Sequence, residues 1–246
     1  MNNDQFIYDM KQNRKYNCLF LINMIIGFIF FIIMPIILIQ DGTEIFHNKY
    51  TVLILVIFLI VFIANIFFIK KIKLSNAKYY IFELNNKISF EKIKEALSSI
   101  DDRELFEEDV FLKRIKLKEN SISKYRILCY KTKDFNKNTF NNIKNDIHKK
   151  YNKKYDLEFK GRGNTTGEKG RINLIIADKL NEELDKFMSS NATGLNTYGI
   201  MMRTINICII GNKMYIQPIK KCIEIPHSTF YFGISKKTYN FLNNIK

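Results

Sequence analysis

The chain has 246 residues with 39 Lys and Arg against 24 Asp and Glu, a net charge of +15. Two apolar stretches occupy roughly its first 70 residues, and the remainder is long enough for one globular domain but not for two. The four cysteines, at positions 18, 129, 208 and 222, lack the paired spacing of a disulfide framework or zinc site, so each is expected to be a small buried hydrophobe.

Residues 18–39 and 52–69 are uncharged and almost entirely apolar. A helix needs about 20 apolar residues to cross the hydrocarbon core of a bilayer. We therefore predict a two-helix transmembrane hairpin over residues 17–70. The first run is too long for a signal peptide and is not followed by a small-residue cleavage site, so cleavage is not expected.

The distribution of positive charge around the two runs predicts their orientation. Three basic residues lie in the flank 1–16, and Lys70, Lys71, Lys73 and Lys78 follow the second run, whereas the connecting loop 40–50 has only Lys49 beside two acids. Lysine and arginine favour the cytoplasmic side. We therefore expect a multi-pass protein of the cell membrane, with both termini and a domain over 75–246 in the cytoplasm.

Each predicted span carries one amide near its cytoplasmic end. In an antiparallel hairpin Asn23 and Asn65 would lie at similar depth, with the small residues Gly27 and Ala64 nearby. Amides in a bilayer seek hydrogen-bond partners. We predict that the two asparagines bond to each other or to another membrane subunit; the alternative is that each reaches the membrane interface. Neither run contains an ionisable residue, which argues against a transporter or channel made from one copy.

The remainder alternates between strand and helix patterns, with short connections. The expected strands are 78–84, 110–118, 122–130, 155–159, 172–177, 204–210 and 213–217, the last two joined at Gly211-Asn212. The expected helices start at Ser89, near residue 136, at Asp178 and at Ser235, and 191–199 is expected to be a loop. Hairpins outnumber crossovers in this order, so we predict an α+β domain with a mainly antiparallel sheet and covering helices.

Basic residues concentrate between positions 111 and 171, after an acidic block at 101–109. This charge has three interpretations: a solvated surface, a surface that contacts anionic lipid headgroups, or a surface that binds nucleic acid, for which no recognition motif is present. The candidate contact residues for lipid or another polyanion are Lys70, Lys71, Lys73, Lys113, Arg114, Lys116, Lys149, Lys150, Lys153 and Lys154.

One short pattern has catalytic potential. Asp156, Glu158 and Lys160 alternate along an expected strand, so their side chains share a face. Two carboxylates could hold Mg²⁺ while the lysine stabilises charge on a phosphate. The pattern resembles the E-x-K half of restriction-endonuclease-like active sites, which implies a metal-dependent nuclease or phosphodiesterase. Alternating charge on the wet face of an edge strand produces the same letters.

The other chemical signals are weaker. The segment 161–170 is rich in glycine, but its lysine is followed by glycine and a strand, so it does not fit a phosphate-binding loop. His148 is expected on the solvated side of its helix. His227, with Cys222 and Glu224 close by in the sequence, could form a dyad or a ligand cluster, but a lone histidine near a strand is usually just packed or exposed.

We therefore expect no cofactor and no catalytic constellation. The sequence favours a non-enzymatic accessory or regulatory subunit of a membrane assembly, with protein partners. A membrane-tethered nuclease or phosphodiesterase and a nucleic-acid-tethering module are the alternatives.

Overall fold

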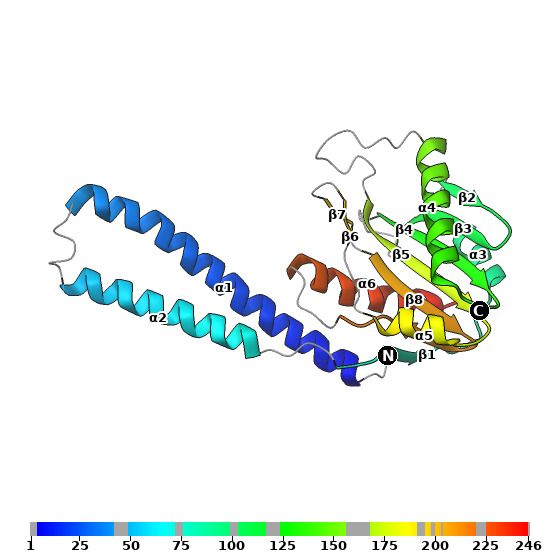
Figure 1. Ribbon diagram of the computed structural model, residues 1–246, viewed down its shortest axis with the longest axis horizontal. Helices are drawn as coiled ribbons and strands as arrows, with labels where there is room; N and C mark the ends of the chain where they lie inside the picture. The colour runs from blue at the N-terminus through cyan, green and yellow to red at the C-terminus, as the bar shows by residue number, and fades with distance from the viewer. Residues whose placement is uncertain are drawn as a thin grey trace. The chain divides into compact units, whose positions relative to one another are not determined.

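The computed structural model describes residues 4–41, 49–71, 76–98, 103–116, 124–155, 168–190, 195–197, 200–202, 204–219 and 225–245. The chain forms two compact units (Figure 1). One contains residues 1–7 and 75–246, and the other contains residues 8–74. The first seven residues thus belong with the large domain, whereas the sequence assigned the flank 1–16 to a separate segment.

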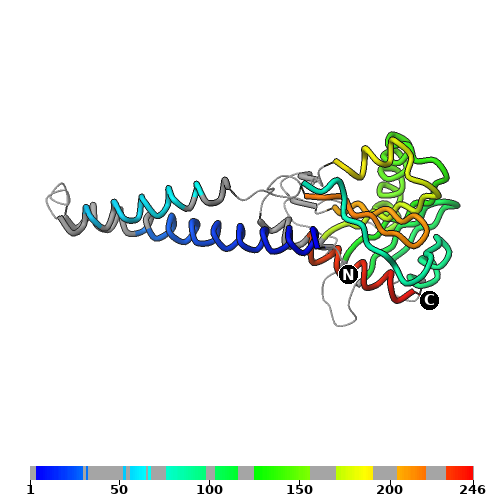
Figure 2. The backbone as a smooth tube through the Cα atoms, turned by 90° about the horizontal axis from the view of Figure 1, so that it is seen from below, coloured from blue at the N-terminus to red at the C-terminus, as the bar shows by residue number. Residues whose placement is uncertain are grey.

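The smaller unit is built from two helices, α1 (Asp4–Asp41) and α2 (Lys49–Lys71). They run in opposite directions along one another (Figures 1 and 2). Both predicted apolar runs are helical, and α1 continues through Pro35 and begins well before residue 18. Within the described residues, we find no helix with both the length and the apolarity needed to cross a membrane. The side chains of 33–41 and 68–71 lie outside that description.

The large domain is built around a seven-stranded sheet in the order β1-β9-β8-β5-β4-β3-β2. Its strands are β1 (Tyr80–Glu83), β2 (Glu104–Phe106), β3 (Val110–Lys116), β4 (Lys124–Thr132), β5 (Glu168–Ala177), β8 (Thr204–Ile210) and β9 (Lys213–Ile216). A separate hairpin pairs β6 (Leu195–Thr197) with β7 (Ile200–Met202), and β6 falls in the segment 191–199 that was predicted to be a loop.

The sheet is mixed: four of its six strand pairings are antiparallel, in line with the α+β prediction, and the two parallel pairings at its centre were not predicted. Strands β4, β5 and β8 are parallel neighbours at its centre, while the four outer pairings are antiparallel. The chain passes from β4 to β5 through the helix α4 (Lys137–Lys154), and from β5 toward β8 through α5 (Glu182–Ser189). Parallel neighbours require such crossovers, whereas a short turn suffices for antiparallel ones.

Helices cover both faces of the sheet. On one face, α4 and α5 pack over alternate strand residues, including Leu112, Leu128 and Ile175. On the other face, Phe90 of α3 (Phe90–Ser98) contacts Phe111, with ring centroids 5.2 Å apart. The helix α6 (Ile225–Asn243) lies on this second face too, where Tyr239 contacts Phe82 of β1. Central strands covered on both sides are apolar at nearly every position.

The first turn of α1 completes this second face. The Phe6 ring is 1% exposed and makes edge-to-face contacts with Tyr80, Phe82 and Phe232, at centroid distances of 5.1, 5.3 and 5.1 Å. Tyr239 of α6 also meets Phe82, at 5.6 Å. Phe6 therefore belongs to the core of the domain, although the sequence placed it in a polar flank.

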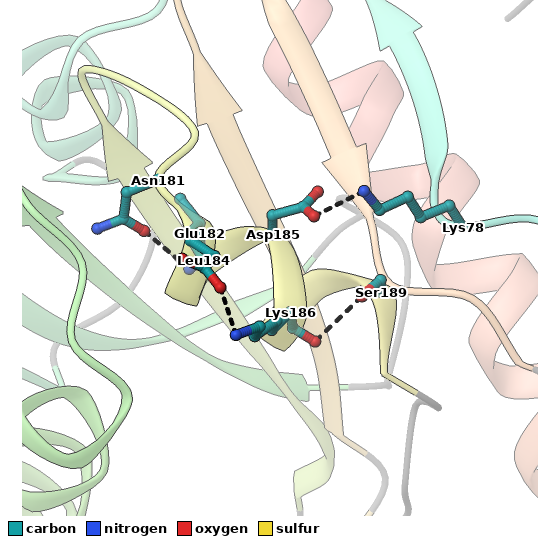
Figure 3. A network of polar contacts seen from close by, with 7 residues as sticks. All are labelled: Lys78, Asn181, Glu182, Leu184, Asp185, Lys186 and Ser189. Carbon is teal, nitrogen blue, oxygen red and sulfur yellow. Dashed lines mark hydrogen bonds and ion pairs between the residues drawn. The ribbon is translucent and has the colours of Figure 1, made fainter.

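Side-chain caps fix the start of three helices. The Ser89 hydroxyl accepts from the Lys92 backbone N–H at 3.2 Å, and Asn136 caps α4, so both predicted starts are confirmed. The cap of α5 is Asn181 and not Asp178, because the Asn181 side chain accepts from the Leu184 N–H at 2.8 Å (Figure 3). The start predicted at Ser235 is wrong, because Ser235 is buried inside α6.

Three further contacts join α5 to its surroundings. Lys78, just before β1, forms an ion pair with Asp185 at 2.6 Å (Figure 3). The Asn181 amide also donates to the Asp134 carboxylate at 2.6 Å and to the Phe135 carbonyl at 2.9 Å. Asn181 therefore links the start of α5 to the loop before α4.

Asn181→Ala is expected to lower the free energy of unfolding by about 1–2 kcal/mol, the upper part of the range for a lost helix cap. Tyrosine fluorescence during chemical denaturation of the full-length protein in mild detergent measures this change. Asp178→Ala is the matched control, since Asp178 is exposed and does not cap α5. An equal loss in both variants would contradict the assignment.

The predicted turn at Gly211-Asn212 is confirmed. Gly211 has φ +62°, in the left-handed region that favours glycine, and it joins β8 to β9. Its carbonyl accepts from the Ile88 N–H at 3.3 Å, and the Asn212 carbonyl accepts from the Leu84 N–H at 2.8 Å. The hairpin thus also anchors the chain that leaves β1.

Candidate functional site

The predicted catalytic group falls outside the described residues. Asp156, Glu158 and Lys160 lie in the segment 156–167, as does the first part of the glycine-rich segment. Glu168 to Gly170, predicted as loop, form the start of β5. Among described residues, no group of three or more His, Cys, Asp or Glu is arranged to hold a metal ion.

The predicted helix contact between Asn23 and Asn65 stays a prediction, because the side chain of Asn65 lies outside the part of the chain that the structure describes. Asn23 is 8% exposed, and its Oδ1 has no hydrogen-bond partner among the described residues. A Cβ built on Gly27 would meet no described atom within 4 Å, so no close approach is seen there. Ala64 is half-buried.

Of the predicted basic contact residues, Arg114 is half-buried, Lys113 is described below, and the other eight divide into two groups. Lys149, Lys150, Lys153 and Lys154 are exposed on α4, whereas the side chains of Lys70, Lys71, Lys73 and Lys116 lie outside the description. Lys150 pairs with Asp146 and Glu107 at 2.7 and 2.8 Å, so part of this charge is neutralised within the domain.

Lys113 is a correction to that set. It is fully buried, and its ammonium lies 3.0 Å from the Glu104 carboxylate directly across the β2–β3 pair. Because the side chain is buried, it is not available to a ligand at the surface. Glu104 supplies the ion pair and hydrogen bond that a buried ammonium requires.

The cysteines also differ from the prediction in one case. Cys129 and Cys208 are buried, as expected, but Cys18 is exposed, and Cys222 lies outside the description. Burial raises the pKa of the Cys208 thiol to about 12. This thiol is therefore protonated at neutral pH and behaves as a small hydrophobe.

The strongest concentration of buried polar groups lies between α4 and the sheet. Arg126 of β4 is fully buried, and its Nη1 donates to Asn152 Oδ1 at 3.0 Å and lies 3.2 Å from His148 Nδ1. The guanidinium carbon is 4.5 Å from the centre of the Tyr151 ring, in a cation–π contact. Three residues of one helix thus surround a single arginine.

His148 is 7% exposed, which corrects the prediction that it is solvated. Lys144, His148 and Asn152 are four residues apart, so they lie along one side of α4 beside its apolar stripe. Since an arginine can only donate, His148 Nδ1 must accept, and the ring proton is therefore assigned to Nε2. That Nε2 is buried and has no hydrogen-bond partner among the described residues.

The histidine is held in its neutral form. Burial, and then repulsion by Arg171, Arg126 and Lys144, place the pKa of His148 well below its usual value. Lys144 is affected in the same way, because burial and the charge of Arg171 lower its pKa. The cations of the described residues between α4 and the sheet therefore act on both side chains.

His148→Gln is expected to reduce the sensitivity of the domain to acid. Below about pH 6.5 the unfolded chain binds a proton at His148 and the native state does not, so stability falls by up to about 1.4 kcal/mol per pH unit until the native pKa is reached. The variant lacks this loss. Denaturation of the full-length protein at several pH values measures how the free energy of unfolding changes with pH in the wild type and in His148→Gln. His47→Gln, in the predicted connecting loop, is the control. Equal pH dependence of His148→Gln and the wild type would contradict the assignment of His148 as a buried, neutral histidine.

A second buried polar group crosses the sheet beside the first. We call it the amide row: Asn173 of β5, Asn206 of β8 and Gln217 after β9. Asn173 Nδ2 donates to Asn206 Oδ1 at 2.7 Å, and Asn206 Nδ2 donates to Gln217 Oε1 at 2.7 Å. Gln217 Nε2 continues to the Phe187 carbonyl and the Ser190 hydroxyl, at 3.0 and 2.6 Å. The row therefore joins three strands to the end of α5.

Neither group was predicted from the sequence: Arg126 was counted among the basic residues of the segment 111–171, and nothing was predicted for the three amides. One signal was available in the sequence of β4. Apolar residues occur at both alternating sets of positions, which is typical of a strand buried on both faces: Tyr125, Ile127 and Cys129 in one set, and Leu128 and Tyr130 in the other. Arg126 within such a strand is expected to be buried. Comparisons with protein families, with curated proteins and with solved structures found no match to this chain.

Proposed function

We propose that the protein is a membrane-anchored accessory or regulatory protein, in which α1 and α2 insert in the bilayer and tether a basic α+β domain to its cytoplasmic side. The observation that carries this proposal is the set of large apolar side chains exposed on both helices. Phe28 and Phe67, for example, are 67% and 63% exposed. The others include Leu21, Met24, Ile25, Leu53, Ile57, Leu59 and Ile60. Large apolar side chains exposed in this number on two helices are typical of a membrane or protein interaction site.

Charge supports the same proposal. The two apolar runs carry no ionisable residue, whereas the basic residues flank them and continue on the domain. Each lysine or arginine near an anionic leaflet contributes about 1 kcal/mol of attraction. The exposed α4 lysines and the flank at 70–73 are suited to this contact.

Insertion is tested by alkaline extraction of membranes from cells that make the full-length protein. The wild type is expected to remain in the membrane pellet. Ile25→Asp combined with Leu59→Asp should release a large fraction, because each central aspartate costs about 2.5–3.5 kcal/mol in an inserted helix. Ile25→Ala with Leu59→Ala is the matched control and should stay in the pellet. Release of the wild type would overturn the proposal.

Orientation is tested with an impermeant thiol reagent on intact cells. In a Cys18→Ser background, His47→Cys in the connecting loop is expected to react from outside, and Lys237→Cys on α6 only after permeabilisation. The reverse pattern would overturn the cytoplasmic placement. A partner retained in stoichiometric amount through native purification in mild detergent would support the accessory role, and a pure single-chain particle would argue against it.

A further inference from the structure

Three arginines occupy directly paired positions on neighbouring strands; we call them the basic row. Arg114 of β3 pairs with Arg126 of β4, and Arg126 pairs with Arg171 of β5. Directly paired residues project from the same face of a sheet, with Cβ atoms about 4.5–5.5 Å apart, and like charges in such positions repel. Arg126 is fully buried, and the other two are half-buried, so water screens this repulsion poorly.

Helix α4 adds further positive charge to the same face. Arg126 contacts His148 and Asn152 of α4, which identifies the face of the sheet from which the basic row projects. Lys144 lies one turn before His148 and is close enough to Arg171 for their charges to interact. Three arginines on one face of the sheet and one lysine of the helix that packs on this face therefore lie at the same interface.

Two hydrogen-bond donors at this place are not used by the described residues. Thr204 of β8 is the strand partner of Arg171 of β5. Its hydroxyl is buried and has no hydrogen-bond partner in the described part of the chain. The same holds for the Nε2 of neutral His148, assigned above as the protonated ring nitrogen. Both side chains are more than nine-tenths buried.

We propose that the basic row, together with Lys144, His148 and Thr204, binds a phosphoryl group. A phosphoryl dianion at this interface is attracted by each of these cations, and burial strengthens that attraction. Guanidinium groups match the geometry of phosphate oxygens through paired N–H donors, and the Thr204 hydroxyl and His148 Nε2–H supply neutral donors. All of these residues lie in the large domain, so the proposal stands independently of membrane insertion.

The phosphoryl group could be a free phosphate or the headgroup of a phosphomonoester lipid, and the experiment separates these sources. Full-length protein in mild detergent is titrated with inorganic phosphate by calorimetry, at constant ionic strength maintained with chloride. In a second arm it is reconstituted into nanodiscs with and without phosphatidic acid, and its midpoint of thermal unfolding is compared. Binding in either arm supports the site and identifies the source. Absence of a response in both arms overturns it.

Matched variants distinguish this site from diffuse attraction by surface charge. Lys144→Gln and Lys92→Gln each remove one positive charge from a helix of the domain, but Lys92 is exposed on α3, at the opposite face of the sheet. Lys144→Gln and Arg171→Gln are each expected to weaken binding at least about tenfold, since each removes one charge-assisted contact, while Lys92→Gln leaves it unchanged. Equal weakening by Lys92→Gln would show non-specific charge binding and overturn the site. Half-buried Arg171 is preferred to Arg126, whose replacement threatens folding.

Discussion

Phe6→Ala is expected to lower the free energy of unfolding of the large domain by about 3–5 kcal/mol, the usual range for truncating a buried phenylalanine. The ring is 1% exposed and meets aromatic rings from β1 and α6, so its loss leaves a cavity at the junction of three chain segments. Chemical denaturation of the full-length protein in mild detergent, followed by tyrosine fluorescence, measures the change.

Tyr8→Ala provides the control for Phe6→Ala. Tyr8 lies two residues later in α1 and is 54% exposed, so its truncation should change domain stability by no more than about 0.5 kcal/mol. A Phe6 variant as stable as the Tyr8 variant would show that the first turn of α1 is not part of the domain core.

The second large effect is expected from Asn206→Leu, which interrupts the amide row at its centre. Asn173 and Gln217 are 2% and 3% exposed, and both would lose their bond to Asn206. A buried polar group left unsatisfied costs about 1–3 kcal/mol, so a combined loss of about 2–4 kcal/mol is expected. The same denaturation experiment measures it.

Two comparisons test the cause of that loss. Asn142→Leu changes an exposed amide on α4 and should have little effect. The double variant Asn173→Leu/Asn206→Leu should lose less than the sum of the single losses, because the first replacement removes a partner that the second would otherwise leave unsatisfied. Strict additivity would indicate that the two amides act separately.

Local signals in the sequence predicted much of the secondary structure. Ser89 and Asn136 cap their helices, and Gly211-Asn212 turns between β8 and β9, because each of these features depends on residues only a few positions apart. Asn181 and Asp178 are equally good capping residues three positions apart, and only the tertiary contacts of Asn181 with Asp134 and Phe135 favour one of them.

Strand pairing was less accessible from the sequence. The pattern of β5 shows that it is buried but not which strands it lies between, and its parallel pairing with β4 and β8 produced the mixed sheet. The basic row was missed for a related reason. Arg114, Arg126 and Arg171 are far apart in the sequence, and only the register of three strands brings them together.

The pairing of β1 with β9 has a consequence for how the chain folds. Tyr80 lies opposite Ile216, and the Asn85 N–H bonds to the Asn243 side chain, 158 residues away. Contacts of such large sequence separation form slowly, because a long loop must close before they contribute. During synthesis, the edge strand β1 can therefore pair, and the Phe6 ring can be buried, only after the last strand and the final helix have been made. Truncation within α6 should accordingly leave the first-made segment of the domain unprotected against proteolysis.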